Sequence, residues 1–134
     1  GKKTLTDILS RRLGLEMVSA GDLVNGYLTL DTQQALDMKN IVDKGLDMPQ
    51  DMIGDVVIER LKEQDCVDKG WVLEGWPSTA EDAAKLVDAG LGPAIALLLE
   101  VPDNTIEDRI SFRLYNPGTG RLYNMQTDPP PLGE

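Results

Sequence analysis

Histidine is absent from the sequence, and cysteine occurs once, as Cys66. Without histidine the chain has neither a histidine general base nor a histidine metal ligand. One cysteine can form no disulfide or zinc cluster within the chain. The longest apolar run, Ala94 to Leu99, has the length of a strand and falls far short of the ~20 residues that span a bilayer. No signal peptide opens the sequence, so we expect an intracellular protein, either cytoplasmic or cytoskeletal.

Positive charge is also scarce. The chain has 13 lysines and arginines against 23 acidic residues, which gives a net charge of −10. This balance argues against nucleic acid and against anionic membranes as partners, because both select basic faces. It does not argue against nucleotides, which need only a local positive pocket. Solvated helix faces are the ordinary interpretation of the acidity.

The apolar spacing predicts helices followed by glycine or turn residues, at 2–13, 32–44, 51–64, 79–89 and 105–115, with a short helix beginning at 23–27. Short apolar runs predict strands at 15–19, 70–73 and 94–101. The last run is nearly continuous, as in a strand that is buried on both faces. Strands that alternate with helices indicate an α/β fold with a parallel sheet.

Three strands with exposed edges would make a poor free-standing domain. The first residue is Gly1 rather than Met, and the last residues are turn-like. We therefore expect a segment of a longer protein. We also expect that these 134 residues alone do not fold stably and show no cooperative thermal transition.

The first candidate functional motif is Gly1-Lys2-Lys3-Thr4, at a predicted helix start. In a phosphate-binding loop, backbone N–H groups cradle phosphate oxygens, a lysine reaches the β/γ-phosphates, and a hydroxyl serves the metal. Lysines in a first helical turn are more commonly just solvated, so this tetrad alone leaves both interpretations open.

Further motifs follow in a fixed order, at Ser19–Leu23, Gly70–Pro77, Val101–Asp103 and Pro117–Tyr123. This ordered set resembles the adenylate kinases over nearly the whole chain. The resemblance implies a P-loop nucleoside-monophosphate kinase fold, with three layers around a five-stranded parallel sheet. The first and last strands would lie outside the chain. Within 1–134, it implies a monophosphate-binding helical part at about 25–66 and the start of a lid at about 116–134.

The resemblance also implies reversible phosphoryl transfer from Mg-ATP to AMP, in which positioning and charge neutralisation matter most. It assigns catalytic roles to Lys2, Arg109 and Arg113. Gly1, Lys3 and Thr4 would hold ATP together with Lys2 and Arg109. Glu74 would help to organise Mg²⁺. Arg109 and Arg113 are expected to share one helix face, because they are four residues apart.

The monophosphate site departs from the family's pattern. Asp22 and Gly75 match it, but Asn25 and Ser78 stand where the family has two arginines that clamp the AMP phosphate. Asn and Ser cannot reproduce a bidentate guanidinium grip. The adenine-reading glutamine corresponds to Glu81 or Asp82, and a carboxylate cannot supply an amide N–H.

These departures favour a non-catalytic or weakly active domain that serves as a structural or ATP-binding module in a larger assembly, and a ciliary or flagellar assembly is one setting. The alternative is an active nucleoside-monophosphate kinase, with Lys3 and Lys44 as candidates for replacement cations. The expected partners are ATP or another adenine nucleotide, the rest of the parent chain, and other proteins.

Overall fold

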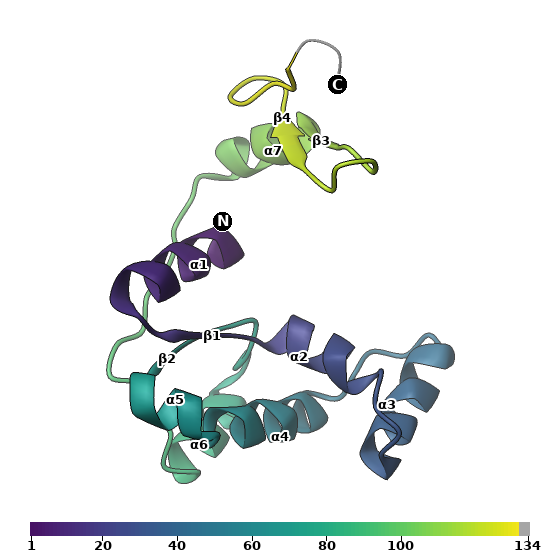
Figure 1. The fold of residues 1–134 in the computed structure, drawn as a ribbon, viewed down its shortest axis with the longest axis vertical. Helices are drawn as coiled ribbons and strands as arrows, with labels where there is room; N and C mark the ends of the chain where they lie inside the picture. The colour runs from purple at the N-terminus through teal and green to yellow at the C-terminus, as the bar shows by residue number, and fades with distance from the viewer. Residues whose placement is uncertain (132–134) are drawn as a thin grey trace. The chain divides into compact units, whose positions relative to one another are not determined.

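A computed structural model describes residues 1–131, in two compact units that divide between Ala96 and Leu97. Figure 1 shows the path of the chain through its helices and strands. No helix within the described residues is long and apolar enough to cross a membrane.

The first unit holds most of the helices and one small parallel sheet. Its elements are, in order, α1 (Lys2–Leu13), β1 (Glu16–Ser19), α2 (Ala20–Tyr27), α3 (Gln33–Asp43), α4 (Gln50–Leu61), α5 (Gln64–Lys69), β2 (Trp71–Glu74) and α6 (Ala80–Asp88). Strands β1 and β2 are parallel, and their register runs from Glu16 opposite Trp71 to Ser19 opposite Glu74. This register brings the carboxyl ends of both strands to one edge, where ligands of α/β folds bind.

Local sequence explains where these helices begin and end. Helix α1 ends at Gly14, whose φ of 68° is left-handed and whose N–H donates to Ser10 O. Glycine adopts this conformation at little steric cost. Helix α6 begins with a capping box, in which the Thr79 hydroxyl accepts from Asp82 N–H and the Asp82 carboxylate accepts from Thr79 N–H. Such reciprocal bonds satisfy two donors that a helix start leaves free.

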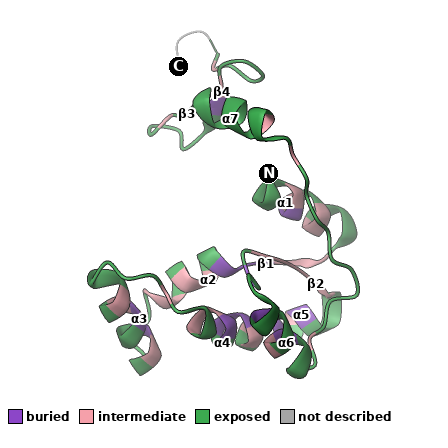
Figure 2. Cartoon of the chain, turned by 180° about the vertical axis from the view of Figure 1, so that it is seen from behind, coloured by how far each residue is buried: buried purple, intermediate pink, exposed green. Residues whose placement is uncertain are grey.

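The core of the first unit forms around α4, which contacts α2 and α6. Its buried residues come from elements far apart in sequence: Val18, Ala20, Val57, Leu61, Cys66, Trp76 and Leu86. Figure 2 shows the buried positions of α4 against the exposed outer faces of the neighbouring helices. Arg60 fastens α4 to α5, since its guanidinium donates to both oxygens of Asp65 at 2.7 Å. That bidentate geometry is the strong form of the pair.

The second unit contains α7 (Asp103–Ser111) and an antiparallel hairpin of β3 (Arg113–Tyr115) and β4 (Leu122–Asn124). The turn between the strands is organised by Asn116, whose side-chain oxygen accepts from the N–H groups of Gly118 and Thr119. Tyr123, in β4, is buried within this unit, at 5% exposure.

Most predicted elements of the first unit are confirmed, including the helix at 2–13 with both its ends. Three expectations are wrong. Helix α2 begins at Ala20 rather than at 23, because the Ser19 hydroxyl caps it by accepting from Asp22 N–H. The predicted buried strand at 94–101 has no regular structure, and Ile95, Leu97 and Leu98 are exposed. A strand persists only beside a hydrogen-bonded neighbour, and no described strand pairs with this segment.

The third wrong expectation concerns the helix at 105–115. It ends at Ser111, and the next residues enter the hairpin, where Arg113 pairs with Asn124. Strand β4, which lies within the expected start of the lid, was not predicted. The last three residues of the expected lid segment, 132–134, lie outside the described residues.

Candidate functional site

The candidate site begins at the N-terminus of α1, where Gly1 is the N-cap and Lys2 and Lys3 fill the first turn. Backbone N–H groups of a first turn have no partner within the helix, and the helix dipole adds partial positive charge there. The first turn contains no acidic residue. Lys2 and Thr4 are exposed, and the Lys2 ammonium makes no hydrogen bond or ion pair within residues 1–131. This end of α1 is therefore suited to an anion.

Lys3 is engaged differently from Lys2. Its Nζ lies 2.9 Å from Asp22 Oδ1 and 2.7 Å from Oδ2, so one ammonium holds both carboxylate oxygens. The hydrogen bond to Asp22 raises the pKa of Lys3 above its ordinary value, and the negative charge of Glu74 acts in the same direction. The pair joins the starts of α1 and α2. Two of the predicted site residues are thus brought together in a way the sequence did not predict.

Glu74 lies at the carboxyl end of β2, directly opposite Ser19 in the parallel register. The Ser19 hydroxyl donates to Glu74 Oε1 at 2.7 Å. Ser19 is buried, at 7% exposure, while Glu74 is half-buried. The carboxylate predicted to organise a metal therefore lies at the carboxyl edge of the sheet, beside Ser19. Within the described residues, no group of three or more Asp, Glu, Cys or His side chains could hold a metal ion.

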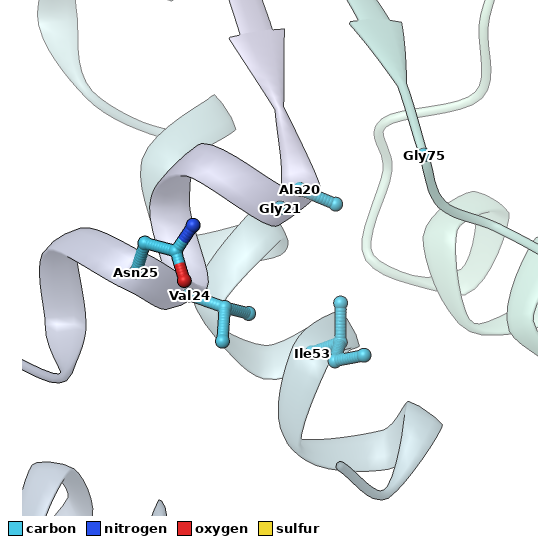
Figure 3. Close-up of a pocket in the computed structure, with 6 residues that line it drawn as sticks. All are labelled: Ala20, Gly21, Val24, Asn25, Ile53 and Gly75. Atoms are coloured by element: carbon cyan, nitrogen blue, oxygen red, sulfur yellow. The ribbon is translucent and has the colours of Figure 1, made fainter. Parts of the chain in front are cut away.

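A pocket of about 260 Å³ lies between α2, α4 and the loop after β2 (Figure 3). Its lining consists of Ala20, Gly21, Val24, Asn25, Ile53 and Gly75. Asn25 and Gly75 are two of the four residues predicted to bind the monophosphate. Asn25 contributes the only polar side chain of this lining, and none of the six residues is charged.

Ser78, the other position at which an arginine was expected, is occupied with structural contacts. Its hydroxyl is shared between Gln50 Oε1 at 3.0 Å and Asp82 Oδ2 at 3.1 Å, and its N–H donates to the same Asp82 oxygen. Burial would raise the pKa of Asp82, but the hydrogen bonds from Ser78 and Thr79 outweigh burial and lower that pKa. Asp82 thus caps α6 as a carboxylate, whereas Glu81 is exposed.

Arg109 and Arg113 belong to the second unit. Arg109 lies in the last turn of α7, and Arg113 is the first residue of β3. They do not share a helix face, because the helix ends between them. Both side chains are exposed. Their contact with phosphate remains a prediction of the resemblance.

A second pocket, of about 410 Å³, was not predicted. It is lined by Met17, Val18, Ser19, Asp22, Leu23, Gly26, Tyr27, Leu30 and Arg60. At its rim the Tyr27 hydroxyl donates to Glu59, which raises the pKa of Tyr27 to about 12. Tyr27 and Glu59 are 32 positions apart, so no local sequence motif predicts their contact.

A helix N-terminus with two lysines lies beside the carboxyl ends of parallel strands, and an ion pair of Lys3 with Asp22 links it to α2; this is the arrangement by which many α/β domains bind phosphate. A family model described as Adenylate kinase matches residues 1–129. The chain belongs to the adenylate kinase family, and the predictions of that family and of an α/β fold are confirmed.

Individual relatives agree with the family match. "Adenylate kinase 8" of Rattus norvegicus is 34% identical over 134 residues, which are 100% of this chain and 28% of that protein. "Probable adenylate kinase 2, chloroplastic" of Oryza sativa subsp. japonica is 32% identical over 130 residues, 97% of this chain and 45% of that protein. "Adenylate kinase" of Trypanosoma brucei rhodesiense is 29% identical over 133 residues, 99% of this chain and 64% of that protein. The chain therefore spans less than two thirds of each relative.

Proposed function

We propose that this domain binds an adenine nucleotide at the N-terminus of α1 but transfers phosphate to AMP weakly or not at all. In this proposal it serves as an ATP-binding or structural module of a larger assembly, for which a cilium or flagellum is one setting. The observation that carries the proposal is the pocket beside Asn25, whose lining has no charged side chain.

A phosphate dianion needs cationic or multiple N–H partners when it leaves water. The pocket offers one side-chain amide, from Asn25. Ser78 is not among the residues that line the pocket, and its hydroxyl is committed to Gln50 and Asp82. Removing one partner of a buried charge pair costs about 2–5 kcal/mol, and each 1.4 kcal/mol is about tenfold in affinity. A site without both arginines is therefore expected to bind AMP at least about a hundredfold more weakly than one that has them.

Asp82 adds an unfavourable charge. With Glu81 it is one of the two residues that correspond to the family's adenine-reading glutamine, and its carboxylate already accepts hydrogen bonds from Ser78 and Thr79. A carboxylate so engaged offers no donor to adenine, and its negative charge opposes a nearby phosphate. Ser78 and Asp82, which the resemblance places near AMP, therefore stabilise the start of α6.

The residues at the start of α1 support retained binding of a nucleotide. Gly1, Lys2 and Thr4 keep the residue types that a phosphate loop uses at a helix start. The Lys2 ammonium is without a protein partner within residues 1–131, so it remains available to a phosphate oxygen. The same availability supports the alternative, in which the domain is an active kinase that uses other cations on the AMP side.

The deciding experiment measures ADP formation from ATP and AMP by the full-length protein, with Lys2→Ala as the control. Absence of turnover in a folded protein that still binds ATP supports the proposed module. Turnover that disappears in Lys2→Ala supports the active kinase and contradicts the proposal.

A second experiment restores the two arginines. The double variant Asn25→Arg, Ser78→Arg is expected to gain at least about tenfold in AMP affinity by calorimetry. Asn40→Arg is the control for a general effect of added positive charge, because it places one arginine on the exposed face of α3, away from the pocket. An unchanged AMP affinity in the double variant would show that Asn25 and Ser78 are not the clamp positions.

A further inference from the structure

Lys3 lies in the first turn of α1, beside the residue proposed to bind nucleotide phosphates, and it faces the first turn of α2. Its ammonium is within hydrogen-bonding distance of both oxygens of Asp22, at 2.7 and 2.9 Å. Both side chains stay accessible, at 62% and 60% exposure. The positive charge is therefore held at the mouth of the site rather than in the core.

The carboxylates at this edge of the sheet do not form a set suited to a divalent ion. Mg²⁺ requires near-octahedral oxygen ligands, which proteins usually supply as one or two carboxylates together with phosphates and water. Asp22 gives both oxygens to Lys3, and Glu74 gives Oε1 to Ser19. Three of these four carboxylate oxygens already accept hydrogen bonds, and no group of three or more Asp, Glu, Cys or His side chains in the described residues could hold a metal ion. The donor set at the expected metal position thus disagrees with the magnesium use that the resemblance implied.

We infer that the Lys3 ammonium takes the role of that ion, so that this domain binds a nucleoside triphosphate without requiring Mg²⁺. An ammonium has three donors, and Asp22 uses two of them, which leaves one N–H for a phosphate oxygen. Asp22 fixes the cation at the site before the nucleotide arrives. The inference rests on the proposed nucleotide site and specifies what neutralises the phosphates there.

The charges around Lys3 support this role. Glu74 lies close enough for its negative charge to favour the protonated amine, and the hydrogen bond to Asp22 acts in the same sense. Lys3 therefore stays cationic at physiological pH. Lys2, without a carboxylate partner in the described part of the chain, adds a second positive charge in the same helical turn.

The test compares ATP affinity with Mg²⁺ and with EDTA in the full-length protein, measured by calorimetry. The wild-type dissociation constants are expected to agree within about twofold, since the cation belongs to the protein. In Lys3→Met, affinity in EDTA should fall about tenfold, and Mg²⁺ should recover most of the loss because Asp22 is released. Lys62→Met is the matched control: this exposed lysine at the end of α4 makes no ion pair within residues 1–131, and its loss should leave both constants unchanged.

The possible failures are distinguishable. If wild-type binding weakens in EDTA as much as binding by Lys3→Met, the inference is overturned while the nucleotide site stands. If ATP binds neither protein with or without Mg²⁺, the proposed nucleotide site is overturned together with the inference. Binding that persists unchanged in Lys2→Ala would place ATP elsewhere and would also overturn both.

Discussion

Gly54 and Trp76 form a close contact that a single methyl group should disrupt. Gly54 lies in the buried face of α4, and Trp76 is 2% exposed. A Cβ added at Gly54 would lie 2.8 Å from Trp76 Cζ2 and 3.3 Å from Cε2. Carbon atoms in contact prefer about 3.5–4.0 Å, so either the indole or the helix must shift. Gly54→Ala is therefore expected to destabilise the domain, although alanine is the better helix former.

The magnitude follows from two opposing effects. Overpacking a well-packed core costs about 1–3 kcal/mol. Exchanging glycine for alanine within a helix gains up to about 1 kcal/mol. The free energy of unfolding should therefore fall by about 1 kcal/mol. Gly26→Ala in α2 is the matched control, because nothing lies within 4 Å of the Cβ it would add. That variant should be more stable than wild type by about 0.5–1 kcal/mol.

Amide hydrogen exchange of α4 under increasing urea measures the local opening free energy in the full-length protein. The two alanine variants should shift this free energy in opposite directions. In a double-mutant cycle with Trp76→Phe, the smaller ring should relieve the clash and give a favourable coupling of about 1 kcal/mol. If Gly54→Ala stabilises the domain as Gly26→Ala does, the contact is not tight in solution and the reasoning is refuted.

Three further predictions concern polar groups. Thr79→Ala removes half of the α6 capping box and should lower the free energy of unfolding by about 1 kcal/mol in urea denaturation, whereas an unchanged value would mean that Asp82 alone suffices. Glu59→Gln should lower the pKa of Tyr27 from about 12 toward its ordinary value, as read from tyrosinate absorbance. Since the native state retains this proton longer than the unfolded state, Tyr27 stabilises the wild type below pH 10 and loses that contribution as the pH rises toward about 12. Burial raises the pKa of the Cys66 thiol, so iodoacetamide should label it slowly in the native protein and quickly in urea; rapid native labelling would contradict its burial.

The sequence predicted the elements whose signals are local. Helix α1 carries its apolar spacing and its terminal Gly14, and α6 carries Thr79 and Asp82, which form its capping box. Periodicity and capping depend on neighbours within one or two turns, so a single sequence reveals them. The ordered motifs further identified the family and the parallel arrangement of β1 and β2.

What the sequence did not predict depends on distant partners. The apolar segment at 94–101 has the composition of a buried strand, but no described strand pairs with it. Arg113 continues the helical spacing of α7, yet its pairing with Asn124 draws it into the hairpin. Within the candidate site, the sequence predicted Lys3 and Asp22 as two separate site residues. Their contact, across 19 positions, required the fold.

The Ser78 hydroxyl, shared between Gln50 and Asp82, also constrains how this domain can evolve. One small side chain ties the start of α4 to the start of α6. A mutation to arginine at this position must break that tie before any gain in phosphate binding can appear. The mutational path toward an AMP-binding site therefore passes through a less stable intermediate, unless Gln50 changes as well. Selection for stability therefore opposes an arginine at position 78, whatever that arginine would add to phosphate binding.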